Sequence, residues 1–111
     1  MVKFHHALNG LKAAMQDHSI RLQVYLGIAA VVIGLFLRLD YGEWMAVSFC
    51  IGMVIAVEIL NTCMERLCDL YTERKDDRIR IIKDMAAAAV LVVSFAAACI
   101  GAMILFAHAC R

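Results

Sequence analysis

Three long apolar segments constrain the fold of this chain more than any other feature. The first, at about 20–39, is long enough to cross the roughly 30 Å hydrocarbon core of a bilayer, and Arg21 and Arg38 near its ends can extend to the interface. The other two lie at about 44–64 and about 85–108. Because only helices and closed barrels pair all their backbone groups in lipid, we expect an all-α membrane protein with three transmembrane helices.

The composition agrees with a membrane protein and argues against several other classes. Apolar residues make up 64% of the 111 residues, against about 45–50% in soluble domains, and the length indicates one domain, 1–111. A net charge of +1, with no basic stretch rich in aromatic residues, argues against nucleic-acid binding. The five cysteines lack C-x-x-C spacing, so we interpret them as small apolar side chains rather than zinc ligands.

Basic residues gather on one side of the predicted membrane domain. Nine of the eleven lie in the amino-terminal segment or between the second and third spans. By the positive-inside rule this side is cytoplasmic, which places the amino terminus in the cytoplasm and the carboxyl terminus outside. The nine residues are Lys3, Lys12, Arg21, Arg66, Arg74, Lys75, Arg78, Arg80 and Lys83.

The segment before the first span has the pattern of a surface helix. Phe4, Leu8, Leu11 and Met15 follow one another at helical spacing. We therefore expect an amphipathic helix at about 3–16 that lies on the cytoplasmic leaflet. The alternative is an amphipathic helix packed against its own bundle, and both alternatives place this segment near the cytoplasmic interface.

A stripe of polar residues runs out of the second span and is the most informative motif. Glu58, Asn61, Glu65 and Asp69 are spaced by three, four and four residues. On a helix they fall within a sector of roughly 80° and extend over about 16 Å. An acidic residue within a span costs about 2.5–3.5 kcal/mol on insertion scales, and like charges four residues apart repel each other. A cation bound beside these carboxylates would offset both costs.

Three interpretations of this polar stripe remain open. In the first, Glu65 and Asp69 are solvated and pair with Arg66 or Lys83, which leaves Glu58 unexplained. In the second, the stripe is a proton or cation pathway. In the third, its carboxylates hold Mg²⁺ against a nucleotide at the membrane surface.

A second polar cluster favours the third interpretation. Lys83 and Asp84 precede the third span, and a lysine beside carboxylates suits phosphoryl transfer, in which positioning and electrostatics supply most of the catalysis. The chain has no G-x-x-x-x-G-K-[ST] loop and no kinase-type glycine loop, so a nucleotide site here is not of a common type.

These residues resemble the prokaryotic diacylglycerol kinase family, which includes undecaprenol kinases, over nearly the whole chain. The strongest match pairs E-x-x-N-T-x-x-E-x-x-x-D with K-D-M-A at this separation. The motifs that carry the resemblance are Asn9-Gly10-Leu11-Lys12-Ala13-Ala14, Glu43-Trp44, the stretch from Glu58 to Asp69, and Lys83-Asp84-Met85-Ala86.

The resemblance implies an architecture and an activity. The family forms homotrimers of three-helix subunits with a surface helix, and its active sites lie between subunits. Its members sit in the bacterial cell membrane with a cytoplasmic active site. They use ATP with Mg²⁺ to phosphorylate a lipid alcohol, giving undecaprenyl phosphate or phosphatidic acid.

The resemblance also implies roles for individual residues. Glu58 corresponds to the general base that takes the proton from the lipid hydroxyl, and Glu65 to a Mg²⁺ and ATP ligand. Asp69 supports this face. The remaining ATP-binding residues implied are Asn61, Lys83, Asp84 and a loop that closes over the nucleotide, comprising Arg74, Lys75 and Asp76.

The match departs from the family at the second metal ligand. The family has a glutamate there, followed four residues later by an arginine. Asp17 and Arg21 have this spacing but lie one residue closer to Gly10, and His18 occupies the ungapped position. The resemblance therefore assigns metal and ATP binding to Asp17, whose side chain is one methylene shorter, and a supporting role to Arg21.

The sequence also favours one lipid substrate and argues against two alternative functions. The Asn61-Thr62 and Glu43-Trp44 pairs look more like the undecaprenol-type members, so undecaprenol is favoured over diacylglycerol. A small proton-coupled transporter is one rival, but such proteins need four spans. A non-catalytic membrane subunit is another, and it offers no reason for four polar groups on one helix face.

Overall fold

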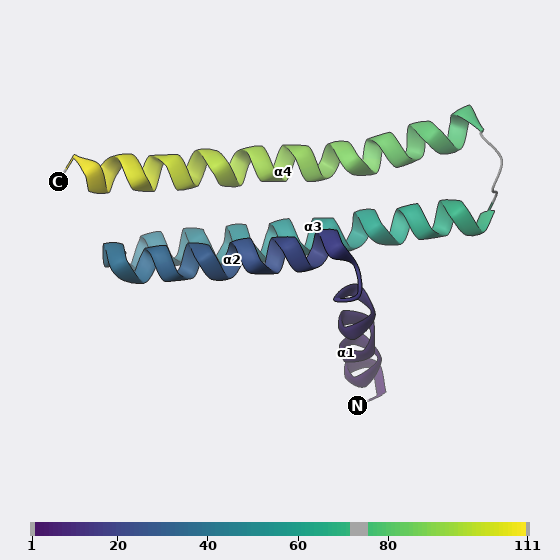
Figure 1. Ribbon diagram of the computed structural model, residues 1–111, viewed down its shortest axis with the longest axis horizontal. Helices are drawn as coiled ribbons and strands as arrows, with labels where there is room; N and C mark the ends of the chain where they lie inside the picture. The colour runs from purple at the N-terminus through teal and green to yellow at the C-terminus, as the bar shows by residue number, and fades with distance from the viewer. Residues whose placement is uncertain (1, 72–75, 111) are drawn as a thin grey trace.

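The computed structural model describes residues 2–71 and 76–110, and within them every regular element is an α-helix. Four helices follow one another: α1 (Val2–Ala14), α2 (His18–Leu37), α3 (Tyr41–Tyr71) and α4 (Asp77–Ala109). In Figure 1, α2, α3 and α4 run along one long axis, while α1 branches away from their side. Helix α3 is the central element, because it packs along α4 and, over a shorter stretch, along α2.

The three helices expected to span the membrane are present. Helices α2, α3 and α4 contain 20, 31 and 33 residues, and each is long and apolar enough to cross a bilayer. The second and third exceed their expected spans of 44–64 and 85–108. The long polar link expected between them is therefore mostly helical, because it contains no proline and many good helix formers such as Leu, Glu, Arg and Lys. Beyond the start of α2, α3 and α4 continue as a pair (Figure 1).

The turn between α2 and α3 is fixed by complementary capping. Arg38 adopts a left-handed conformation with φ 56°, and its backbone N–H donates to the carbonyls of Gly34 and Leu35 at the end of α2. At the start of α3, the Glu43 N–H donates to Asp40 Oδ1 at 2.8 Å, and the Asp40 N–H donates to Glu43 Oε1 at 3.0 Å. This reciprocal capping box closes the connection within a few residues.

Helices α2 and α3 approach closely at two glycines of α2. A Cβ atom on Gly27 would lie 2.9 Å from Cγ2 of Ile51, and one on Gly34 would lie 2.8 Å from Cη2 of Trp44. Such small residues allow helices to pack tightly within a membrane. The two contacts fix the alignment of α2 along α3.

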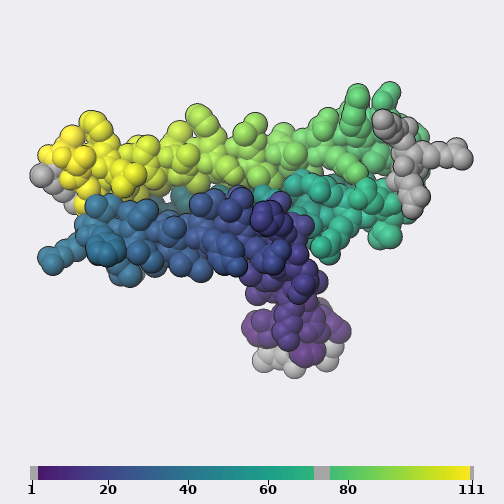
Figure 2. All heavy atoms as spheres, viewed as in Figure 1, coloured from purple at the N-terminus to yellow at the C-terminus, as the bar shows by residue number. Residues whose placement is uncertain are grey.

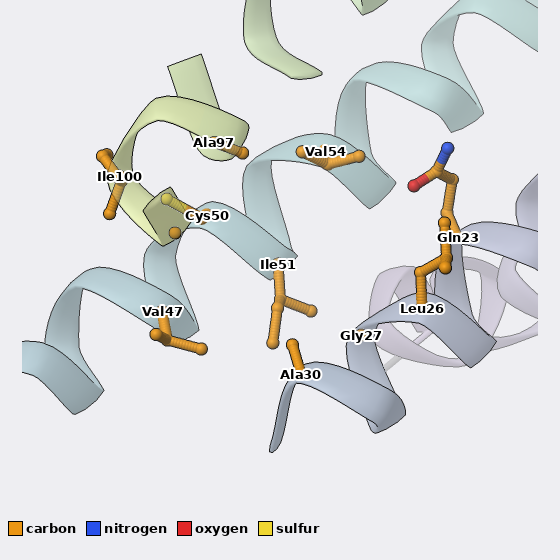
Figure 3. Close-up of a pocket in the computed structure, with 11 residues that line it drawn as sticks. Gln23, Leu26, Gly27, Ala30, Val47, Cys50, Ile51, Val54, Ala97 and Ile100 are labelled. Carbon is orange, nitrogen blue, oxygen red and sulfur yellow. The ribbon is translucent and has the colours of Figure 1, made fainter. Parts of the chain in front are cut away.

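Helix α4 packs on α3 but leaves an apolar groove facing α2. The groove has a volume of about 190 Å³. Figure 3 shows its lining from all three helices, which includes Gly27, Ala30, Val47, Ile51, Ala97 and Ile100. Among the described residues the buried apolar side chains are few, namely Ala14, Ile20, Leu39 and Cys68. Most of the apolar surface of the subunit therefore faces outward.

Helix α1 is present where the surface helix was expected, but it ends at Ala14 rather than at 16. It protrudes from the side of the elongated bundle (Figures 1 and 2). Phe4, Leu8 and Leu11 are exposed, whereas Ala14 is buried at the junction with α2. The alternative in which this helix packs its apolar residues on its own bundle is therefore wrong for the isolated subunit.

The glycine contact gives a test of the α2–α3 packing. We expect Gly27→Val to lower the free energy of unfolding by about 1–3 kcal/mol, because the new side chain overlaps Ile51 in a tight interface. Chemical denaturation in detergent micelles, followed by circular dichroism, measures the change. Gly101→Val is the matched control, since a Cβ there meets no atom within 4 Å among the described residues. Equal losses in the two variants would contradict the contact.

Candidate functional site

A single continuous helix carries the polar stripe predicted from the sequence. Glu58, Asn61, Glu65 and Asp69 all lie on α3, which extends without interruption to Tyr71. Glu58 is only 7% exposed, whereas Glu65 and Asp69 are exposed. The stripe thus begins at Glu58, which is buried within the bundle, and ends at Asp69, which is exposed.

Asp17 reaches this stripe from the turn between α1 and α2. It has the extended backbone of a helix N-cap residue, with φ −83° and ψ 132°, yet its side chain makes no capping hydrogen bond. Instead its Oδ2 accepts a hydrogen bond from Oγ1 of Thr62 at 3.4 Å. Thr62 is 9% exposed. The second metal ligand expected from the sequence is therefore placed beside α3, one turn from Glu58.

Three carboxylates form one electrostatic unit at this point. The negative charges of Asp17 and Glu65 both act on Glu58, which is also the most desolvated of the three. In the described part of the chain, neither Glu58 nor Glu65 forms an ion pair with a basic side chain. Like charges held close to a buried carboxylate are stabilised by a bound cation.

Asn61 connects this unit to a further acceptor. Its Nδ2 donates to Glu65 Oε1 at 3.1 Å. Its Oδ1 is buried and accepts no hydrogen bond from the described residues. A buried acceptor without a donor is costly and indicates a group that binds there.

Lys83 joins the outer end of the stripe from α4. Its Nζ lies 2.6 Å from Asp69 Oδ1. The interpretation of the stripe as ordinary ion pairing therefore holds for Asp69, and within the described residues it does not extend to Glu58 or Glu65. Asp84 follows Lys83 and is exposed.

The other predicted site residues are less closely joined to the stripe. Asp76 caps α4, accepting a hydrogen bond from the Arg78 N–H at 2.9 Å, and its bonds to Arg78 hold the pKa of its carboxyl below the ordinary value. The side chain of Arg21 is exposed. Arg74 and Lys75 lie outside the described residues.

Two polar contacts were not anticipated from the sequence. Thr62 was assigned no role of its own, although it lies four residues from Glu58 and so on the same helix face. His108 Nε2 lies 3.0 Å from both carboxylate oxygens of Glu43 and joins the end of α4 to the start of α3. No sequence signal links these two residues, which are 65 positions apart.

The donor set fits a hard cation that a nucleotide brings with it. Within residues 2–71 and 76–110, no three His, Cys, Asp or Glu side chains form a ready-made metal site. Mg²⁺ seldom needs one, since it is usually held by one or two carboxylates, waters and substrate phosphates. Glu65 and Asp17 supply suitable oxygens, with Asn61 Oδ1 nearby on the same face.

Comparison with known proteins gives a consistent result. The family model described as prokaryotic diacylglycerol kinase matches residues 5–105. The undecaprenol kinase of Bacillus subtilis (strain 168) is 30% identical over 102 residues, covering 91% of this chain and 83% of that protein.

Two more distant relatives carry another name. The diacylglycerol kinase of Synechocystis is 28% identical over 107 residues, covering 95% of this chain and 61% of that protein. The diacylglycerol kinase of Helicobacter pylori is 27% identical over 88 residues, covering 78% of this chain and 69% of that protein.

The Lys83–Asp69 pair can be tested for a structural role. We expect Asp69→Asn to lower Tm by less than about 5 °C, because exposed ion pairs contribute little to stability. Thermal denaturation in micelles measures this shift. Asp77→Asn is the control, because its more exposed pair with Arg80 is longer, at 3.9 Å. A decrease in Tm much larger for Asp69→Asn than for Asp77→Asn would show that the Lys83–Asp69 pair is a main stabilising contact between α3 and α4.

Proposed function

The chain belongs to the prokaryotic diacylglycerol kinase family and is a lipid kinase, and we propose that it transfers the γ-phosphate of ATP to the hydroxyl of a membrane lipid. The observation that carries this proposal is the convergence of Glu58, Glu65 and Asp17 where α2 begins beside α3. The family match gives no support to a transporter or a non-catalytic subunit.

Glu58 is the proposed general base. It is buried and lies at the end of the stripe farthest from the exposed Asp69, so we place the lipid hydroxyl at this end and the nucleotide at the aqueous end. A base in this position accepts the hydroxyl proton as the oxygen attacks the γ-phosphorus. The attacking lipid oxygen and the leaving oxygen of ATP must lie in line on either side of the γ-phosphorus, and the length of the stripe leaves room for both substrates.

Glu65 and Asp17 are the proposed ligands of Mg²⁺ bound with ATP. When bound, Mg²⁺ neutralises phosphate charge and so favours transfer. Asn61 keeps Glu65 in place through its amide nitrogen and offers its unpaired oxygen to the nucleotide complex. Glu65 is exposed, so its carboxylate remains open to phosphates arriving from the aqueous side.

Lys83 is proposed to contact the ATP phosphates. Its ammonium group already lies at the outer end of the stripe, where Asp69 holds it. Asp84 and the segment containing Arg74, Lys75 and Asp76 are proposed to complete the nucleotide site, and Arg21 to support Asp17.

Undecaprenol is the proposed acceptor, in preference to diacylglycerol. The support is the Asn61-Thr62 pair and the relative named undecaprenol kinase, which is 30% identical, against 28% and 27% for the two relatives named diacylglycerol kinase. The difference in identity is small, so the identity of the product decides between the two lipids.

The proposed assembly is a homotrimer in the bacterial cell membrane, with active sites between subunits on the cytoplasmic side. The support is physical. The described part of α4 contributes no buried residue to the subunit, and few apolar side chains are buried in the others. The position of the basic residues supports the orientation, and the exposed Phe4, Leu8 and Leu11 support an α1 that lies on the cytoplasmic leaflet.

The proposed chemistry is tested with purified protein, labelled ATP, Mg²⁺ and either undecaprenol or diacylglycerol. We expect phosphorylated undecaprenol to form faster, and Glu58→Gln and Glu65→Ala to lower kcat by at least about 100-fold, since each removes a group that acts in the transition state. Asp17→Ala is expected to raise the Mg²⁺ requirement.

The control for these variants is Asp40→Asn. Asn caps helices as well as Asp does, and Asp40 lies at the other end of the bundle, so activity should be retained. Full activity of both glutamate variants would refute the assigned roles, and transfer to neither lipid would refute the proposed acceptor class.

Removal of divalent cations tests the metal requirement separately. We expect a chelator to abolish transfer, and added Mg²⁺ to restore it, because the clustered carboxylates and the triphosphate repel each other without a cation. Activity that persists in excess chelator would contradict the metal assignment.

A further inference from the structure

Asp17 occupies a capping position that its side chain does not use. In the N-cap position of α2, an aspartate ordinarily accepts a hydrogen bond from the backbone N–H of the second or third helical residue, here Ser19 or Ile20. No such bond is present, and the carboxylate bonds to Thr62, which lies 45 residues away on α3. The Asp17 carboxylate therefore has two possible partners, the backbone at the start of α2 and the hydroxyl of Thr62. In the structure it is bonded to Thr62.

We propose that Thr62 is a positioning residue that holds the Asp17 carboxylate at the polar stripe of α3 and keeps it from capping α2. The inference rests on the proposed function, because it concerns a ligand of the proposed metal site. Thr62 itself touches no reacting group in this account and acts only through Asp17.

The chemistry of a hydroxyl suits this task. The negative charge of Asp17 acts on that of Glu58, so the charge of Asp17 opposes its position beside α3. A lysine or arginine would hold it there, but would also neutralise the charge that a cation needs. The hydroxyl of Thr62 donates one hydrogen bond to Oδ2 of Asp17 and brings no positive charge of its own.

The surroundings of Thr62 restrict its direction. Its side chain is buried, and a β-branched residue on a helix has few χ1 rotamers. On the α2 side, Ile20 is fully buried one turn after Asp17 and fixes the start of α2 against the bundle. The Thr62 side chain and the start of α2, which follows Asp17, are therefore both held by packing.

Metal binding is measured without catalysis, by electron paramagnetic resonance of Mn²⁺ in the presence of a non-hydrolysable ATP analogue. We expect Thr62→Val and Thr62→Ala to weaken Mn²⁺ binding roughly tenfold, the size of effect expected for one hydrogen bond to a charged group. Thr62→Ser should restore binding, and Ser94→Ala, which removes a hydroxyl from α4, should have no effect.

A double-mutant cycle tests whether Thr62 acts through Asp17. Asp17→Ala should weaken Mn²⁺ binding, and adding Thr62→Val to it should cause no further loss. Additive losses would overturn the inference, as would unchanged Mn²⁺ binding in both Thr62→Val and Thr62→Ala.

Hydrogen exchange of the metal-free protein gives a second readout, because the inference predicts slower amide exchange whereas a general loss of structure predicts faster exchange. In Thr62→Val the released Asp17 should cap α2, so exchange at the amides of Ser19 and Ile20 should become slower, and this slowing should vanish when Asp17 is also alanine. General loosening would instead make exchange faster, and that result would overturn the inference.

Failure of the proposed function is distinguishable from failure of this inference. If the wild-type protein transfers no phosphate to lipid, the proposed function is wrong. If it does so and loses activity in Glu58→Gln, while both Thr62 readouts stay unchanged, only the positioning role is wrong. Absence of Mn²⁺ binding in the wild-type protein would overturn both the metal assignment and the inference.

Discussion

The structure depends on carboxylates held close together where a membrane helix leaves the apolar bundle. Asp17 and Glu65 both repel the charge of Glu58, and Glu58 is also shielded from water. Such an arrangement is unfavourable for a subunit that only needs to fold. The proposed binding of a cation and a polyphosphate there would offset this repulsion. The charge repulsion that destabilises this site is thus also what would attract the cation needed for the proposed activity.

The apolar part of the molecule determines where this cluster lies. Contacts at Gly27 and Gly34 align α2 with α3, and the turn before α2 then meets α3 at the level of Thr62. Beyond that level α3 and α4 continue as a pair (Figure 1), and Lys83 joins Asp69 across them. Helix length and packing therefore place Glu58 in the buried part of α3 and Glu65 in its exposed part.

The features that follow from local periodicity could be predicted from the sequence. The apolar runs give the three long helices, and the spacing from Glu58 to Asp69 gives one polar face, because both depend only on helix geometry. The Asp17–Thr62 and Glu43–His108 contacts could not be predicted in this way. Each joins residues far apart in sequence, and each depends on turns and on the alignment of packed helices.

The most direct measurement is an experimental structure of the protein with a non-hydrolysable ATP analogue, Mg²⁺ and the lipid alcohol. The account predicts that the terminal phosphate lies between Glu65 and Lys83, with the metal near Glu65 and Asp17 and the lipid hydroxyl within hydrogen-bonding distance of Glu58. A nucleotide bound away from Lys83, with its metal in contact with neither Glu65 nor Asp17, would contradict it.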